Sequence, residues 1–324
     1  MAGNEFDLIA RYFEQQAVER RDVELAIGDD CALLKVPEGC QLAVSTDSLV
    51  AGTHFLADAD PKWIAHKALA SNLSDLAAMG ATPAWVSLAL TMPTPDETWL
   101  DGFCQGFFAL AEYYNVQLVG GDTTKGPLSI TLTVHGFIPQ GQALTRGGAS
   151  NGDWVYVTGN LGDSAAGLAL ILGERELDDA NLANTLIQRH YLAQPRILAG
   201  QALRGIASAA LDISDGVVSD LGHILKRSGL GAVIHVEKLP LSEELREFEP
   251  DLAKAQQLAL TSGEEYELCF TVPEAHRGAV DVALAHTGVT ATCIGQLYPG
   301  CDVTLQSAGK AIDWQLHGYD HFAE

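Results

Sequence analysis

The sequence predicts an α+β protein of two domains, in which mixed sheets pack against helices. Its 324 residues are enough for two cores, and an apolar content of 47% with 12 prolines is typical of a globular protein. Both halves alternate strand-like and helix-like segments, which favours layers of sheet and helix. Residues 140–153 are rich in glycine and alanine. We expect the domain boundary there, with one domain over residues 1–145 and the second over residues 146–324.

Hydrophobic spacing and end signals give the elements of the first half. Asp60 and Pro61 are typical of a helix start, and Gly80 of a helix end. The segment Thr94-Pro95-Asp96-Glu97 resembles a capping box. We expect helices over residues 5–16, 61–79 and 97–114, and strands over residues 32–36, 41–45, 85–91, 116–119 and 129–138. The second of these strands would carry Thr46 and Asp47 at its end, and Asn72, Asp75 and Met79 would share one helix face.

The second half is interpreted in the same way, and it shows a faint internal echo of the first. Residues 43–47 (AVSTD) resemble residues 211–215 (LDISD), which hints at two related halves. The expected strands cover residues 154–158, 209–212, 233–236, 267–272 and 293–296. The expected helices cover residues 164–172, 186–203 with a break at Pro195, and 217–227 ending at Gly229.

Aspartates at the ends of apolar runs, beside glycine, serine or threonine, are the main indication of function. They occur in five segments: Gly28-Asp29-Asp30, Ser45-Thr46-Asp47, Asn72-Leu73-Ser74-Asp75, Gly120-Gly121-Asp122 and Asp212-Ile213-Ser214-Asp215. Mg²⁺ prefers carboxylate oxygens and commonly binds substrate phosphates at the same time. One Gly-Asp pair would be an ordinary turn, but five such segments predict a dispersed Mg²⁺–phosphate site.

Composition excludes several other classes. A net charge of −23 argues against nucleic acid as a partner. The six cysteines form no CxxC pair, and the first ten residues carry no signal sequence, so we expect reduced thiols and a cytoplasmic protein. No apolar stretch is long enough to cross a membrane. The ten histidines show no HExxH spacing, so zinc is not indicated.

The common nucleotide-binding signatures are absent from the sequence. There is no GxxxxGK[ST] loop, no GxGxxG after a strand and no HRD loop. An ATP site would therefore need another construction. Gly120, Gly121 and Gly126 around Asp122 suggest a nest of backbone N–H groups, and Arg146 suggests a charge-assisted contact to phosphate, although a simple turn also explains the glycines.

Taken together, these segments resemble the thiamine-monophosphate kinase family of the aminoimidazole-ribonucleotide-synthetase-like superfamily. The resemblance also covers Ala26-Ile27-Gly28, Thr53-His54-Phe55, Leu76-Ala77-Ala78-Met79-Gly80, Glu264-Glu265-Tyr266-Glu267-Leu268 and Gly318-Tyr319-Asp320-His321-Phe322. It implies an N-terminal domain that forms a homodimer and a C-terminal α/β domain. It also implies the reaction of ATP with thiamine phosphate to give thiamine diphosphate, with several Mg²⁺ ions and a monovalent cation as a further candidate cofactor.

The resemblance also implies roles for individual residues. The metal ligands would be Asp30, Ser45, Thr46, Asp47, Asp75, Asp122, Asp212 and Asp215. Gly121, Asp122, Arg146 and Ser214 would contact ATP, and His54, Gly263 and Tyr319 would contact the thiamine part. The sequence departs from the family pattern at Lys125, where an arginine is expected, and at Ser262 and Glu265, where an SGGED-like motif has glycine and aspartate.

The chemistry of a phosphate acceptor agrees with this interpretation. A phosphate monoester, with a second pKa near 6, is a dianion near neutral pH and needs no general base. The difficulty is repulsion between two polyanions, which metal ions relieve. We therefore expect direct in-line transfer, no catalytic base or nucleophile from the protein, and a positioning role for His54.

The sequence argues against some alternative functions and leaves two open. A selenophosphate synthase would need a reactive cysteine in an early glycine-rich loop, and the carbamoyl dehydratase of hydrogenase maturation would end in a cysteine. Neither feature is present. A Ca²⁺-binding module would cluster its acids in one D-x-[DN]-x-[DN]-G loop, which is also absent. A purine cyclo-ligase-like enzyme and a two-metal phosphatase remain as alternative functions.

Overall fold

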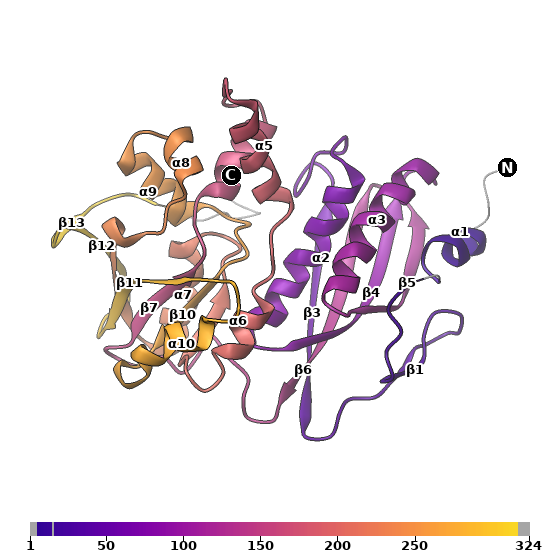
Figure 1. Cartoon of the computed structure of the whole chain (residues 1–324), viewed down its shortest axis with the longest axis horizontal. Coiled ribbons are helices and arrows are strands. Elements are labelled where there is room, and N and C mark those ends of the chain that lie inside the picture. Colours follow the sequence, from indigo (N-terminus) through magenta and orange to yellow (C-terminus); the bar gives the residue numbers. More distant parts are fainter. Residues whose placement is uncertain (1–4, 15, 317–324) are drawn as a thin grey trace. The chain divides into compact units, whose positions relative to one another are not determined.

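The computed structural model describes residues 5–14 and 16–316, which divide into two compact units (Figure 1). The first contains the described residues up to Leu76 together with Ala81–Gly141. The second contains Ala77–Gly80 and the described residues from Gln142 onwards. Within the described part of the chain, no helix combines the length and apolar character needed to cross a bilayer.

The first unit is built on a four-stranded sheet in the order β3-β6-β4-β5, in which only β4 and β5 run parallel. A small antiparallel pair, β1 and β2, lies beside it. Its elements are α1 (Glu5–Tyr12), β1 (Val23–Leu25), β2 (Leu33–Leu34), β3 (Cys40–Val50), α2 (Pro61–Ala78), β4 (Thr82–Met92), α3 (Glu97–Tyr113), β5 (Gln117–Lys125) and β6 (Ser129–Pro139).

Helices α2 and α3 lie together on one face of this sheet (Figure 1). Their packing is close at Gly106 of α3, where an added Cβ would lie 2.1 Å from the carbonyl oxygen of Lys62 in α2. Only glycine fits at such an approach. On the other face, β1 and β2 contribute apolar residues to a cluster around Trp85 and Phe137, while Val44 of β3 is 55% exposed.

The second unit contains a seven-stranded mixed sheet in the order β13-β12-β9-β11-β7-β10-β8, in which only β12 and β9 are parallel. Its strands are β7 (Trp154–Thr158), β8 (Ala209–Asp212), β9 (Gly231–His235), β10 (Leu268–Val272), β11 (Ala291–Tyr298), β12 (Val303–Ser307) and β13 (Lys310–Ile312). Its α-helices are α4 (Asp163–Ile171), α5 (Ala180–Tyr191), α6 (Ile197–Ala202), α7 (Val217–Ser228), α8 (Glu243–Phe248), α9 (Leu252–Thr261) and α10 (Val280–Leu284). Apolar residues of β7, β8 and α7 form much of its main core.

The structure confirms the mixed α/β character of both halves and changes several boundaries. Helix α2 ends at Ala78, one residue earlier than expected, and Gly80 just beyond it has a positive φ of +67°. Asp96, rather than Thr94, caps α3 by accepting the N–H groups of Thr98 and Trp99. The expected break at Pro195 is confirmed, since α5 and α6 lie on either side of it, but α5 begins earlier than expected, at Ala180.

Candidate active site

Strand β3 and helix α2 bring together four of the polar residues singled out in the sequence. Ser45 and Asp47 alternate with Thr46 along β3, so their side chains share one face of the strand. The Ser45 hydroxyl donates to Asp75 Oδ2 at 2.5 Å, and the backbone N–H of Asp47 donates to Asn72 Oδ1 at 3.1 Å. The predicted shared face of Asn72 and Asp75 on α2 therefore faces β3.

Two carboxylates in this group disfavour each other's charge. The pKa of Asp47 is raised to about 6, first because the carboxyl group is buried and second because Asp75 is close. A divalent cation between these groups would remove the repulsion and lower the pKa of Asp47. Carboxylate and hydroxyl oxygens, as Asp47, Asp75 and Ser45 provide here, are ligands that Mg²⁺ accepts.

Strand β3 does not end where the sequence suggested. It continues to Val50, so Thr46 and Asp47 lie inside the strand and not at its end. Thr46 consequently points to the face opposite Asp47, where its hydroxyl lies 3.0 Å from that of Thr133 in β6. The structure thus separates Thr46 from Ser45 and Asp47, although the three are consecutive in the chain.

The glycines before Asp122 form a strand and not a nest. Residues 120–122 lie within β5 and pair in parallel with Ser87, Leu88 and Ala89 of β4. At Gly121, with φ of +154°, an added Cβ would lie 1.8 Å from the Leu88 carbonyl oxygen. This glycine therefore permits close strand pairing, and the expected turn of free N–H groups is wrong.

Asp122 and Asp30 line a common cavity in the first unit. The cavity has a volume of about 760 Å³, and its wall includes Gly28, Asp29 and Asp30 from one loop and Gly120, Gly121 and Asp122 from β5. In register, Asp122 pairs with Ala89, Ala89 with Thr131, and Thr131 with Ser48. Asp122 is therefore on the same sheet face as Ser48 and Thr46, opposite Asp47. Lys125 is the exposed last residue of the same strand.

His54 is held by two contacts in the turn that follows β3. Its Nδ1 accepts the backbone N–H of Val50 at 3.1 Å, and its carbonyl oxygen accepts a 2.7 Å bond from the ammonium group of Lys67. Lys67 is fully buried, which is rare for lysine. The sequence analysis missed Lys67, whose only signal was a cation in the apolar stretch of α2.

In the second unit, Ser214 and Asp215 occupy a tight loop between β8 and α7. Their backbone N–H groups both donate to Asp220 Oδ2, at 3.0 Å and 2.9 Å. Asp212 is the buried last residue of β8. Burial raises the pKa of Asp220 to about 6, and the charge of Arg146 opposes this rise. Arg146 is exposed and lies near this loop, so the structure groups it with Ser214.

Gly263 packs directly against that loop. An added Cβ at residue 263 would lie 2.7 Å from the Ser214 carbonyl oxygen. The backbone N–H of Glu264 donates to that same oxygen at 2.8 Å, and the N–H of Tyr266 donates to the Ile213 carbonyl at 2.9 Å. Gly263 is thus placed beside Ser214 and Asp215. Tyr319, the other residue predicted to contact thiamine, lies outside the described residues.

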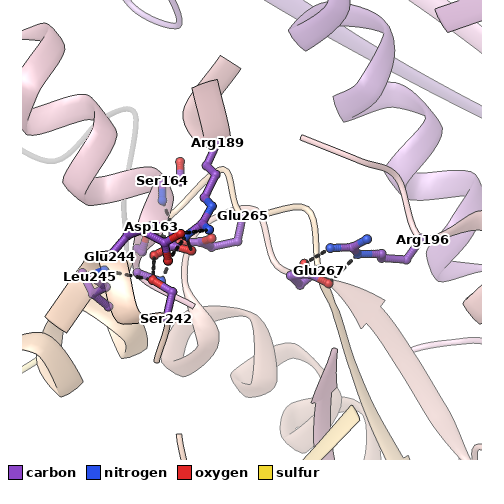
Figure 2. A network of polar contacts seen from close by, with 11 residues as sticks. Asp163, Ser164, Arg189, Arg196, Ser242, Glu244, Leu245, Glu265 and Glu267 are labelled. Atoms are coloured by element: carbon purple, nitrogen blue, oxygen red, sulfur yellow. Dashed lines mark hydrogen bonds and ion pairs between the residues drawn. The ribbon is translucent and has the colours of Figure 1, made fainter. Parts of the chain in front are cut away.

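A polar network that the sequence did not predict surrounds residues 262–267 (Figure 2). Glu265 Oε1 accepts bonds from the N–H groups of Gly162 and Ser164, at 2.8 Å and 3.3 Å, and a 2.5 Å bond from the Ser262 hydroxyl. Ser262 and Glu265, the two residues that differ from the family motif, are therefore hydrogen-bonded to each other. Glu267 forms a bidentate ion pair with Arg196.

The described residues contain no group of three His, Cys, Asp or Glu side chains that would hold a metal ion unaided. Mg²⁺ characteristically binds through one or two carboxylates together with substrate phosphates and water. The pair Asp47 and Asp75 fits that mode, as do the separate acids Asp30, Asp122, Asp212 and Asp215.

The chain is one of the AIR synthase related proteins. Their N-terminal domain matches residues 28–138, and their C-terminal domain matches residues 150–307. Within that class, the chain belongs to the thiamine-monophosphate kinase family. It is 58% identical over 327 residues to the thiamine-monophosphate kinase of Escherichia coli K12, covering 100% of this chain and 99% of that protein.

Solved structures give the same result. The thiamine-monophosphate kinase of Stenotrophomonas maltophilia is 42% identical, with a TM-score of 0.86 over 95% of this chain and 98% of that one. AaThiL complexed with AMPPCP and TMP is 33% identical, with a TM-score of 0.78 over 98% and 96% of the two chains. The expected family and its two-domain fold are confirmed.

Proposed function

We propose that this chain transfers the γ-phosphoryl group of ATP directly to the phosphate of thiamine phosphate. Phosphorylation of thiamine phosphate is the activity of its family, and a relative has been solved with AMPPCP, an ATP analogue, and TMP. The observation that supports the direct mechanism is the pair Asp47 and Asp75, because burial and the charge of Asp75 raise the pKa of Asp47 and a bound cation would relieve this repulsion. ATP and thiamine phosphate are the substrates, and the product is thiamine diphosphate.

We propose Mg²⁺ as the cofactor. When bound, it neutralises phosphate charge and so lowers the barrier to the approach of two polyanions. The residues that would hold it are Asp30, Ser45, Thr46, Asp47, Asp75, Asp122, Asp212 and Asp215, as the family resemblance implies. A monovalent cation and a cytoplasmic location remain predictions.

The protein supplies position and charge rather than an acid or base. The acceptor phosphate is a dianion near pH 7 and is already a nucleophile. A serine–histidine–glutamate series does occur, because Ser164 Oγ lies 3.0 Å from His190 Nδ1 and His190 Nε2 lies 3.5 Å from Glu264. However, Ser164 and His190 are each only 2% exposed, so this hydroxyl is not presented to a substrate.

The decisive experiment follows both product and stereochemistry. Release of ADP should depend on added thiamine phosphate, with one thiamine diphosphate formed per ATP consumed. ATP that is chiral at the γ-phosphorus should give inverted product, because a single displacement inverts configuration. Retention would instead reveal a phospho-enzyme. Phosphate release without thiamine diphosphate would favour the two-metal phosphatase, and ATP use only with a formylated purine precursor would favour the cyclo-ligase.

Arg146 is proposed to contact the ATP phosphates. Replacing Arg146 with alanine should raise KM for ATP about 10- to 150-fold, because a charge-assisted hydrogen bond contributes roughly 1.5–3 kcal/mol. KM for thiamine phosphate should change little. Arg227→Ala provides a control, since it removes a cation from α7 of the same unit. An unchanged KM for ATP with a raised KM for thiamine phosphate would move Arg146 to the other substrate.

We also propose that the chain forms a homodimer through the first unit. Strand β3 is an edge strand, and Leu42, Val44 and Val50 on its outer face are 38–55% exposed. Exposed apolar edges of this kind are commonly covered by another chain. Val44→Asp should therefore lower the mass measured by light scattering from dimer towards monomer. Val282→Asp, at a 74% exposed position in the second unit, should leave the mass unchanged.

A further inference from the structure

Helix α4 begins without a cap of its own. Its N-cap residue is Gly162, with φ of +96° and no side-chain hydrogen bond to the first turn. The N–H groups of such a turn need partners from elsewhere. Here they come from a distant segment: Gly162 and Ser164 donate to Glu265, and the N–H of Ala165 donates to the Ser262 hydroxyl at 3.0 Å. The loop of residues 262–267 therefore caps α4.

The same loop adopts an unfavourable backbone conformation. Glu264 and Tyr266 have φ of +57° and +54°, in the left-handed region that residues other than glycine seldom adopt. Each such residue costs roughly 1–3 kcal/mol and persists only where its surroundings hold it. The contacts of Ser262 and Glu265 to α4 lie on either side of Glu264. They are thus placed to hold this conformation.

The strained backbone is joined to the loop that carries Ser214 and Asp215. The N–H groups of Glu264 and Tyr266 donate to the carbonyl oxygens of Ser214 and Ile213, and the N–H of Ile213 donates to the Glu267 carbonyl at 2.8 Å. A shift of residues 263–266 would therefore move the backbone of residues 213–215. Both segments contain residues that the family resemblance assigns to substrate or metal.

Glu265 differs from the neighbouring acids in how its charge is compensated. Asp163 is paired with Arg189, and Glu267 with Arg196, whereas the partners of Glu265 are two backbone N–H groups and a hydroxyl. Burial, followed by the charges of Asp163 and Glu267, raises the pKa of Glu265 to about 8. An uncharged carboxyl group retains the acceptor oxygen Oε1 that these contacts need.

We propose that Glu265 is a positioning residue for phosphoryl transfer, which fixes residues 213–215 and 263–266 by anchoring their loop to the amino end of α4. The inference rests on the proposed function for its kinetic consequences. The role is one of positioning, since the hydrogen bonds of Glu265 and Ser262 go to the start of α4, to each other and to the Gly263 carbonyl. Its chemical requirement is an acceptor of the length of glutamate, and not a negative charge.

Three substitutions test this requirement in the full-length enzyme. Glu265→Gln keeps the length and the acceptor oxygen, so kcat and both KM values should stay within about threefold of the original. Glu265→Asp shortens the side chain and Glu265→Ala removes it. Both should raise KM for thiamine phosphate and lower kcat, by about 10- to 100-fold in kcat/KM, the scale of lost alignment. Glu244→Gln is the matched control, because Glu244 belongs to the same network but its side-chain hydrogen bonds go to Arg189 rather than to residues 262–267.

Hydrogen exchange supplies a readout that does not depend on activity. The amides of Ile213, Glu264 and Tyr266 should exchange faster in Glu265→Asp than in the original protein, and at the original rate in Glu265→Gln. If the original enzyme did not phosphorylate thiamine phosphate, the proposed function would fail while these exchange rates would still report on the anchoring.

Either of two results with the Glu265 variants would overturn the proposal. The first is a folded Glu265→Asp with unchanged kinetics and exchange. The second is loss of activity in Glu265→Gln with unchanged activity in Glu265→Asp, which would show that charge matters and length does not. If Glu265→Asp and Glu265→Ala do not fold, Ser262→Ala serves in their place. It removes one hydroxyl that both bonds Glu265 and caps α4, and an unchanged KM for thiamine phosphate in that variant would also overturn the proposal.

Discussion

Replacing Asp47 with asparagine should lower kcat/KM on the order of 10²- to 10³-fold or more at ordinary Mg²⁺ concentrations. The side chain keeps its shape but loses the charge that would bind the cation beside Asp75. The effect should appear in the Mg²⁺ dependence as well as in turnover, with half-saturation displaced to higher metal concentration. Steady-state kinetics over a Mg²⁺ titration measure both. Near-original activity in Asp47→Asn would remove Asp47 from the metal site.

The same substitution should stabilise the protein when metal is absent. Asp47 has its pKa raised from 3.8 to about 6 in the folded protein, so the folded state holds its proton more tightly than the unfolded state does. Stability is therefore lost as pH rises from about 4 through about 6. Asparagine has no charge to bury and avoids this loss.

Thermal unfolding in EDTA provides the measurement. Asp47→Asn should have a higher Tm than the original protein at pH 7, and the difference should shrink towards pH 4. Added Mg²⁺ should raise the Tm of the original protein, because a ligand of the native state stabilises it, and should raise that of the variant less. Asp58→Asn, which changes an exposed acid of the same unit, should alter neither result. A lower Tm for Asp47→Asn in EDTA would contradict the proposed repulsion with Asp75.

Hydrophobic periodicity and end signals predicted most elements because they are local. Helix α2 shows this well, since Pro61 at its start and Gly80 after its end are both read from the chain alone. Strand pairing is not local. The strand after residue 116 was expected to stop at Gly120, because glycine usually signals a turn. In the structure, β5 continues through Gly121 since β4 lies too close there for any side chain.

Part of the candidate site was also predictable from local sequence features. Asn72 and Asp75 were expected on one helix face, and both have partners on β3, in the N–H of Asp47 and the hydroxyl of Ser45. The sequence did not predict that Thr46 and Asp47 lie on opposite faces of β3, because this depends on how far the strand extends. The anchoring of residues 262–267 had no sequence signal, since Glu265 reaches a helix about one hundred residues earlier in the chain. Such contacts depend on the tertiary structure.

The second large effect is expected from Arg196. Its guanidinium group pairs with both carboxylate oxygens of Glu267, and the Thr158 hydroxyl donates to Glu267 Oε2 at 2.5 Å. The Glu267 side chain is 7% exposed and that of Arg196 is 21% exposed. Arg196→Ala would leave a buried carboxylate without its cation. We expect a loss of about 3 kcal/mol in the free energy of unfolding, the lower end of the range for buried pairs because Arg196 is partly exposed.

Guanidinium-induced unfolding at pH 7 would measure this loss, and a double substitution tests its cause. If the cost comes from the stranded charge of Glu267, then Arg196→Ala combined with Glu267→Gln should be more stable than Arg196→Ala alone. Arg11→Ala is the control, because the pair of Arg11 and Glu97 is exposed on both sides and should contribute little. If Arg196→Ala and Arg11→Ala proved equally mild, the ion pair would not hold Glu267. Anchoring of residues 262–267 would then rest on the contacts of Ser262 and Glu265 with α4, and Glu265→Asp should have the larger effect on the loop.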